Sequence, residues 1–132
     1  MTAHAEITGL ILAGGRAQRM GGIDKGLVPF MGKPLIEHAI ARLGPQVTTI
    51  LINANRNHDR YAQYGHAVIA DHHADFAGPL AGFAAGLEHC NSEYLLSVPC
   101  DSPVYLLNLS EQLLEEMIST QSDLVYASSV DP

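Results

Sequence analysis

The chain has 132 residues, 47% hydrophobic and 16% charged, with a formal net charge of −7. This is the composition of an ordinary globular protein, and we expect one domain, 1–132, with its own core. The negative charge argues against a nonspecific nucleic-acid or membrane surface, and no apolar stretch approaches transmembrane length. No secretory signal is visible, and Cys90 and Cys100 form no C-x-x-C motif, so we expect reduced, buried thiols in a cytoplasmic protein.

Short apolar runs alternate along the chain with segments of helical period. Strands are expected at 7–12, 47–52, 67–70, 94–98 and 124–127, and helices at 35–43 with Pro34 in the first turn, 57–64, 79–87 and 109–118. This alternation is typical of repeated βαβ units with right-handed crossovers. It predicts an α/β fold: a three-layer αβα sandwich around a Rossmann-like, mostly parallel sheet. Open sheets of this kind bind ligands at the carboxyl ends of their strands.

The loop after the first strand, residues 12–26, is rich in glycine and in positive charge. Four of the seven lysines and arginines of the chain lie between residues 16 and 33: Arg16, Arg19, Lys25 and Lys33. Glycines let the backbone approach a ligand closely, and free N–H groups with nearby cations favour phosphate. A plain glycine-rich turn is the alternative, and the loop matches neither G-x-x-x-x-G-K-[ST] nor G-x-G-x-x-G. We interpret it as a cradle for a small polyanion.

Polar side chains follow each of the next three expected strands: Asn53 and Asn55, then Asp71, then Asp101. Turns favour Asn and Asp for local reasons, but these three polar strand ends, together with Gly14 and Gly15 after the first strand, lie at one edge of the sheet and indicate a site. Asp101 could hold a divalent cation beside nucleotide phosphates, with capping in Asp-Ser-Pro as the alternative. Lys25 and Arg19 would neutralise phosphate charge, or be surface cations. The seven histidines show no ligand spacing.

The segment Leu-Ala-Gly-Gly-x-x-x-Arg-Met-Gly-Gly-x-Asp-Lys from Leu12 resembles the signature of the MobA-like nucleotidyltransferases, the molybdenum cofactor guanylyltransferases in particular. Gly-Pro-Leu-Ala-Gly from Gly78 and Pro-Cys-Asp ending at Asp101 resemble further motifs of this family. The resemblance implies a fold of the nucleotide-diphospho-sugar transferase type. It also implies magnesium-dependent transfer of GMP from GTP to the terminal phosphate of molybdopterin or Mo-molybdopterin, with release of pyrophosphate.

The resemblance also implies roles for individual residues. Arg19, Lys25 and Asp101 would be catalytic, and Asp101 would bind Mg²⁺. The implied nucleotide contacts are Leu12, Ala13, Gly14, Gly15, Lys25, Asn53, Asp71, Gly78, Pro79, Leu80 and Asp101. Because the acceptor phosphate is already an anionic nucleophile, no side-chain base is required, and catalysis would come from positioning and charge neutralisation.

The family normally continues beyond the position of Pro132, so the resemblance implies that its C-terminal part is absent and that 124–127 forms an exposed edge strand. Two alternatives stay open. One is a sugar-phosphate or cytidylyl nucleotidyltransferase of the same fold, and the other is a noncatalytic nucleotide-binding fragment. The expected partners are GTP, the molybdopterin acceptor and transient partners in molybdoenzyme maturation, with no nucleic acid or membrane.

Overall fold

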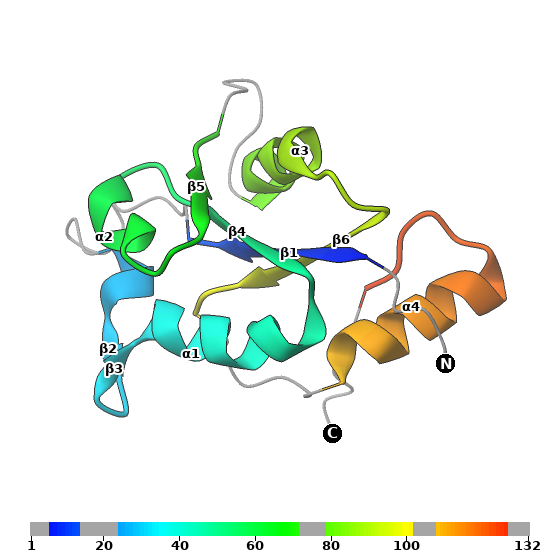
Figure 1. Cartoon of the computed structure of the whole chain (residues 1–132), viewed down its shortest axis with the longest axis horizontal. Coiled ribbons are helices and arrows are strands. Elements are labelled where there is room, and N and C mark those ends of the chain that lie inside the picture. The colour runs from blue at the N-terminus through cyan, green and yellow to red at the C-terminus, as the bar shows by residue number, and fades with distance from the viewer. Residues whose placement is uncertain (1–5, 14–23, 72–78, 102–107, 127–132) are drawn as a thin grey trace.

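The computed structural model describes residues 6–13, 24–71, 79–101 and 108–126 (Figure 1). Several residues singled out in the sequence therefore lie outside the described residues, namely Gly14, Gly15, Arg16, Arg19 and Gly78. The chain forms three layers, with helix α3 (Pro79–His89) on one face of a central sheet and helices α1 (Leu35–Leu43) and α4 (Leu109–Thr120) on the other (Figure 1). This arrangement confirms the predicted αβα sandwich.

The central sheet is parallel and has the strand order β5-β4-β1-β6. Its strands are β1 (Ile7–Leu12), β4 (Thr49–Asn53), β5 (Ala67–Ile69) and β6 (Tyr94–Pro99), and the short helix α2 (His58–Ala62) lies between β4 and β5. The chain runs outward from β1 through β4 to β5 and then crosses to β6 on the other side of β1. Such a reversal of strand order is the point at which doubly wound sheets bind ligands.

Apolar side chains leave the sheet on both faces, as a strand buried on both sides requires. Leu10 and Leu51 pack with Ala85 of α3, whereas Ile11 and Ile52 belong to the larger cluster that includes residues of α1. This two-sided burial explains why the strands read as continuous apolar runs in the sequence. None of the helices in the described parts of the chain is long and apolar enough to cross a membrane.

The segment before α1 contains elements that the sequence did not predict. A 3-10 helix, η2 (Lys25–Leu27), is followed by a hairpin of β2 (Pro29–Phe30) and β3 (Lys33–Pro34). Pro34 is the N-cap residue, directly before the first residue of α1, instead of lying in the first turn of this helix. The second expected strand begins at Thr49, two residues late, because a further 3-10 helix, η3 (Gly44–Gln46), ends only just before it.

Two further sequence predictions are wrong in the described residues. Leu124, Val125 and Tyr126, the described part of the expected strand at 124–127, form no strand. Leu124 and Tyr126 are 70% and 83% exposed, and a short apolar run without a paired neighbour does not make a strand. Cys90, expected to be buried, is only partly buried, while Cys100 is buried as expected; both thiols are free.

Candidate functional site

The carboxyl ends of the four parallel strands lie in one row across the sheet. Leu12 is paired with Asn53 on one side and with Pro99 on the other, and Asn53 is paired in turn with Ile69. The ladder continues past these ends, since Ala13 donates its backbone N–H to the Asn53 carbonyl at 2.8 Å. The side chains that follow the strands therefore lie along a single edge of the sheet.

On the β4–β5 side of this edge, two asparagines hold one carboxylate. Asn53 Nδ2 donates to Asp71 Oδ1 at 2.8 Å, and Asn55 Nδ2 donates to Asp71 Oδ2 at 2.9 Å. Asn55 Oδ1 also accepts the backbone N–H of Asp71 at 2.9 Å. Asn53 is buried. Both carboxylate oxygens therefore have fixed partners, and Asp71 is anchored to the end of β4.

The start of α3 lies against the same strand ends. Gly82 contacts the Asn53 carboxamide, and a Cβ on it would stand 2.7 Å from Leu12 Cδ2, so glycine permits this close approach. Pro79 is the first helical residue, as predicted. Leu80 is 67% exposed, which leaves its side chain available to a ligand.

On the β6 side, Lys25 and Asp101 face each other. Lys25 Nζ lies 3.4 Å from Asp101 Oδ2, with 52% and 43% of the two side chains exposed. An ion pair this exposed contributes little to stability, so both groups are available to a charged ligand. Since β4 and β1 separate β5 from β6, the edge has an amide-rich half around Asp71 and an ionic half around Asp101.

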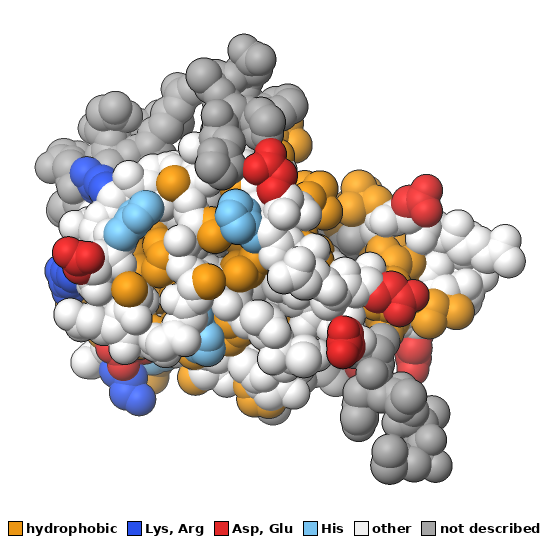
Figure 2. Space-filling model, turned by 45° about the horizontal axis from the view of Figure 1, so that its top comes forward, with side chains coloured by type: hydrophobic (Ala, Val, Ile, Leu, Met, Phe, Trp, Pro, Cys, Tyr) orange, Lys and Arg blue, Asp and Glu red, His pale blue; other side chains and the backbone are white. Residues whose placement is uncertain are grey.

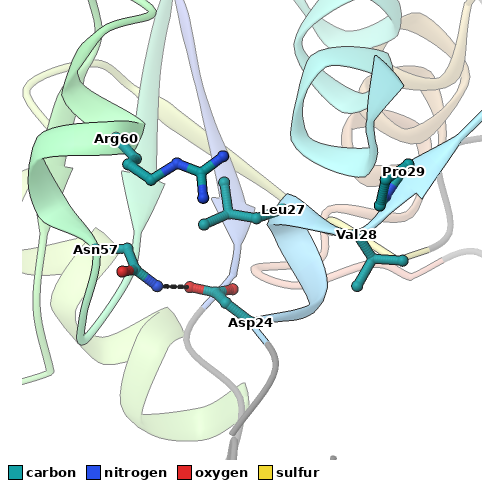
Figure 3. A pocket seen from close by; sticks show the side chains of 6 residues that line it. All are labelled: Asp24, Leu27, Val28, Pro29, Asn57 and Arg60. Atoms are coloured by element: carbon teal, nitrogen blue, oxygen red, sulfur yellow. Dashed lines mark hydrogen bonds between the residues drawn. The ribbon is translucent and has the colours of Figure 1, made fainter. Parts of the chain in front are cut away.

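A cavity of about 400 Å³ opens beside the ionic half, and the sequence analysis did not anticipate it. It is lined by Asp24, Leu27, Val28, Pro29, Asn57 and Arg60 (Figure 3). In Figure 3 the Asn57 side chain points to Asp24, to which it is hydrogen-bonded at 3.0 Å.

Charge is distributed unevenly over the molecule. On the face shown in Figure 2, Lys and Arg lie at the end that carries α2 and the β2–β3 hairpin, whereas Asp and Glu lie both at that end and toward α4. Lys25, Lys33, Arg56 and Arg60 belong to segments of the first end, whereas α4 contributes three glutamates. Among the described residues, these four cations therefore lie toward one end of the molecule, the end that carries Lys25 of the ionic half.

The described residues offer a limited set of metal ligands. They contain no group of three or more His, Cys, Asp or Glu side chains that could hold a metal ion. Mg²⁺ is commonly bound through one or two carboxylates together with substrate phosphates, rather than in a cage of protein ligands. The exposed carboxylate of Asp101 fits that mode of binding.

The thiol of Cys100, next to Asp101, is expected to react far more slowly than that of Cys90. Burial and the charge of Asp101 raise the pKa of Cys100 to about 12, so this thiol stays protonated at pH 8. Burial opposes ionisation of Cys90, but hydrogen bonds with Ser92 and Thr8 outweigh it and lower the pKa of Cys90. Alkylation followed by peptide mass mapping should show Cys90 modified first. Equal rates at pH 8 would contradict this difference.

The fold and its polar strand ends define an α/β protein of the doubly wound, Rossmann-like class. The sequence pattern of the MobA-like NTP transferase domain matches residues 9–131, and the chain belongs to that family. The resemblance drawn from Leu12, Gly78 and Asp101 is thereby confirmed at the level of the family.

Similar proteins include the molybdenum cofactor guanylyltransferases of Polynucleobacter asymbioticus, 60% identical over 131 residues, and of Ralstonia pickettii, 49% identical over 132 residues. The matches cover 99% and 100% of this chain. The chain spans 66% and 65% of the length of these two relatives.

Solved structures show the same fold at lower identity. Molybdopterin-guanine dinucleotide biosynthesis protein A from Archaeoglobus fulgidus superposes with a TM-score of 0.66 at 24% identity, covering 86% of this chain and 56% of that one. A CMP:2-keto-3-deoxy-manno-octonic acid synthetase complexed with CTP gives 0.71 at 20% identity, covering 89% and 49%. A Mycobacterium tuberculosis protein in complex with manganese gives 0.61 at 12% identity, covering 86% and 60%. These likenesses concern the fold alone.

Proposed function

We propose that the protein is a guanylyltransferase, which transfers GMP from GTP to the terminal phosphate of molybdopterin or Mo-molybdopterin. The observation that carries this proposal is the identity of 49–60% to molybdenum cofactor guanylyltransferases across essentially the whole chain. The geometry supports it, because Lys25 and Asp101 place a cation and a carboxylate together at the edge where doubly wound sheets bind nucleotides.

In the proposed reaction, an oxygen of the acceptor phosphate attacks the α-phosphorus of GTP. A new P–O bond forms as the bond between the α-phosphorus and its bridging oxygen breaks, and pyrophosphate leaves with the electron pair. Lys25 would neutralise negative charge on the triphosphate and the leaving pyrophosphate, together with Arg19, which lies outside the described residues. The attacking oxygen is already anionic, so these residues need only orient the reactants and balance charge.

Asp101 would hold Mg²⁺, which when bound supplies further neutralisation of phosphate charge. On the other half of the edge, Asn53 and Asp71 would contact the nucleotide. Leu12, Ala13, Pro79 and Leu80 would line its binding site, together with Gly14, Gly15 and Gly78 outside the described residues. The backbone N–H groups at the start of α3 are free of helical partners, so they can serve as donors to a guanine base.

We further propose that the chain folds as one domain and acts in the cytoplasm, with transient partners in molybdoenzyme maturation. The two free thiols support a reducing compartment. The net charge of −7 speaks against nucleic acid as a partner.

Turnover tests the proposed function directly. The protein is incubated with Mg²⁺, molybdopterin and either GTP or CTP, and dinucleotide and pyrophosphate are measured by mass spectrometry and a coupled assay. We expect equimolar guanine dinucleotide and pyrophosphate from GTP. A preference for CTP would favour a cytidylyltransferase, and nucleotide binding without any product would favour a noncatalytic binding protein.

A further inference from the structure

The carboxylate of Asp24, the residue before Lys25, is held by donors from two parts of the chain. Asp24 is the N-cap of η2, and its Oδ1 accepts the backbone N–H of Gly26 at 3.2 Å. The typical interaction of an N-cap carboxylate is one hydrogen bond accepted from a backbone N–H of the first turn. Here Oδ1 also accepts from Tyr61 Oη at 2.5 Å, and Oδ2 accepts from Asn57 Nδ2 at 3.0 Å. Thus the beginning of η2 is tied to α2, more than thirty residues away in the sequence.

Tyr61 is the buried member of this network. None of its surface is exposed, and it packs in the larger apolar cluster of the core. Burial and the hydrogen bond to Asp24 raise the pKa of Tyr61, so the hydroxyl stays protonated and acts as the donor. Gly26 lies directly against the Tyr61 side chain, with the position of a Cβ only 3.1 Å from ring atom Cε1. Tyr61 therefore contacts the residues on both sides of Lys25.

The Lys25 side chain is half exposed, and its ammonium pairs with Asp101. A lysine side chain has many rotamers, so its backbone position limits which phosphates its ammonium can reach. That backbone is bounded by Asp24 and Gly26, and Nζ lies 3.4 Å from Asp101. We propose that Tyr61 is a positioning residue that acts through Asp24 and Gly26 to hold Lys25 where its ammonium meets the nucleotide phosphates. This inference rests on the proposed function of Lys25.

Tyr64 provides a matched control. Its hydroxyl donates to Glu37 Oε2 at 2.9 Å, and its ring packs against the same apolar cluster. Burial and Glu37 raise the pKa of Tyr64, as burial and Asp24 do for Tyr61. Both Tyr61→Phe and Tyr64→Phe delete one hydroxyl that donates to a carboxylate. Only the first of these carboxylates is attached to the Lys25 segment.

The test combines amide hydrogen exchange without nucleotide and calorimetric titration with GTP and with guanosine, both in the presence of Mg²⁺. In Tyr61→Phe we expect exchange at Gly26 and Leu27 to be about tenfold faster and the Kd for GTP about tenfold higher, with the Kd for guanosine unchanged. Tyr64→Phe should match wild type in all three measurements. Asn57→Gly removes the Oδ2 donor and keeps the left-handed backbone at φ 56°, so it should weaken GTP binding in the same direction without a change in the core.

Equal exchange in Tyr61→Phe and Tyr64→Phe would overturn the inference. Faster exchange with unchanged GTP affinity would also overturn it, because the anchoring would then have no effect on Lys25. A wild-type protein that binds no triphosphate would instead refute the proposed function. In that case the exchange comparison still decides whether Tyr61 holds the Lys25 segment, so the two failures are distinguishable.

Discussion

Asp101→Asn is expected to lower the rate of GMP transfer by about a hundredfold to a thousandfold, the range seen when one preorganised electrostatic group is removed from an active site. Asparagine keeps the shape of the side chain but loses the charge, and a neutral amide is a weaker ligand for Mg²⁺ than a carboxylate. Asp101 is 43% exposed, so the substitution should leave the fold intact. The measurement is kcat as a function of Mg²⁺ concentration.

Asp123→Asn is the matched control, since Asp123 is an exposed carboxylate beyond α4 and far from the strand ends in the sequence. It should retain the wild-type rate and the wild-type dependence on Mg²⁺. If Asp101→Asn behaved like this control, Asp101 would not be the magnesium ligand, and its role would be reduced to the ion pair with Lys25.

Lys25→Ala is expected to raise the Kd for GTP by about tenfold to a hundredfold, the typical effect of losing one hydrogen bond to a charged group. The Kd for guanosine should stay the same, because the ammonium contacts phosphate and not the base. Loss of the ion pair with Asp101 should cost little stability, since about half of each side chain is exposed to solvent. Parallel titrations with GTP and guanosine measure the difference.

Lys33→Ala controls for loss of positive charge as such, because Lys33 is an exposed lysine on β3 at the same end of the molecule. It should leave both Kd values near those of wild type. Equal losses of GTP and guanosine affinity in Lys25→Ala would show that the substitution disturbs the site as a whole, contrary to a phosphate-specific role.

The sequence predicted those parts of the fold that depend on local pattern. The strand Ile7–Leu12 has the predicted bounds, because a six-residue apolar run followed by glycines is typical of a strand buried on both faces. From such assignments the common edge of Asn53, Asp71 and Asp101 follows, since parallel strands end together. The roles of these residues remain predictions.

The hairpin of β2 and β3 could not be predicted in this way. Its turn places Met31 at φ 51° and Gly32 at φ 85°, whereas turns with two left-handed residues usually carry Asn-Gly or Asp-Gly. Methionine at such a position gives no turn signal. The antiparallel pairing of Phe30 with Lys33 therefore became visible only in the structure.

The link between Tyr61 and Asp24 was missed for a different reason. The two residues are 37 positions apart, and nothing local to either indicates that a buried hydroxyl meets a capping carboxylate. From the sequence, a tyrosine in a short helix is interpreted as an ordinary core residue. Only the packing of α2 beside η2 shows that its hydroxyl reaches the segment that carries Lys25.

Calorimetric titration of the protein with GTP, CTP and ATP, with and without Mg²⁺, tests the central claim most directly. A guanylyltransferase site predicts that GTP binds tighter than CTP or ATP by about tenfold or more, since unpaired donors and acceptors in the base site reject the wrong base. Mg²⁺ should tighten GTP binding through Asp101. Equal affinity for the three nucleotides, or no binding by folded protein, would contradict the claim.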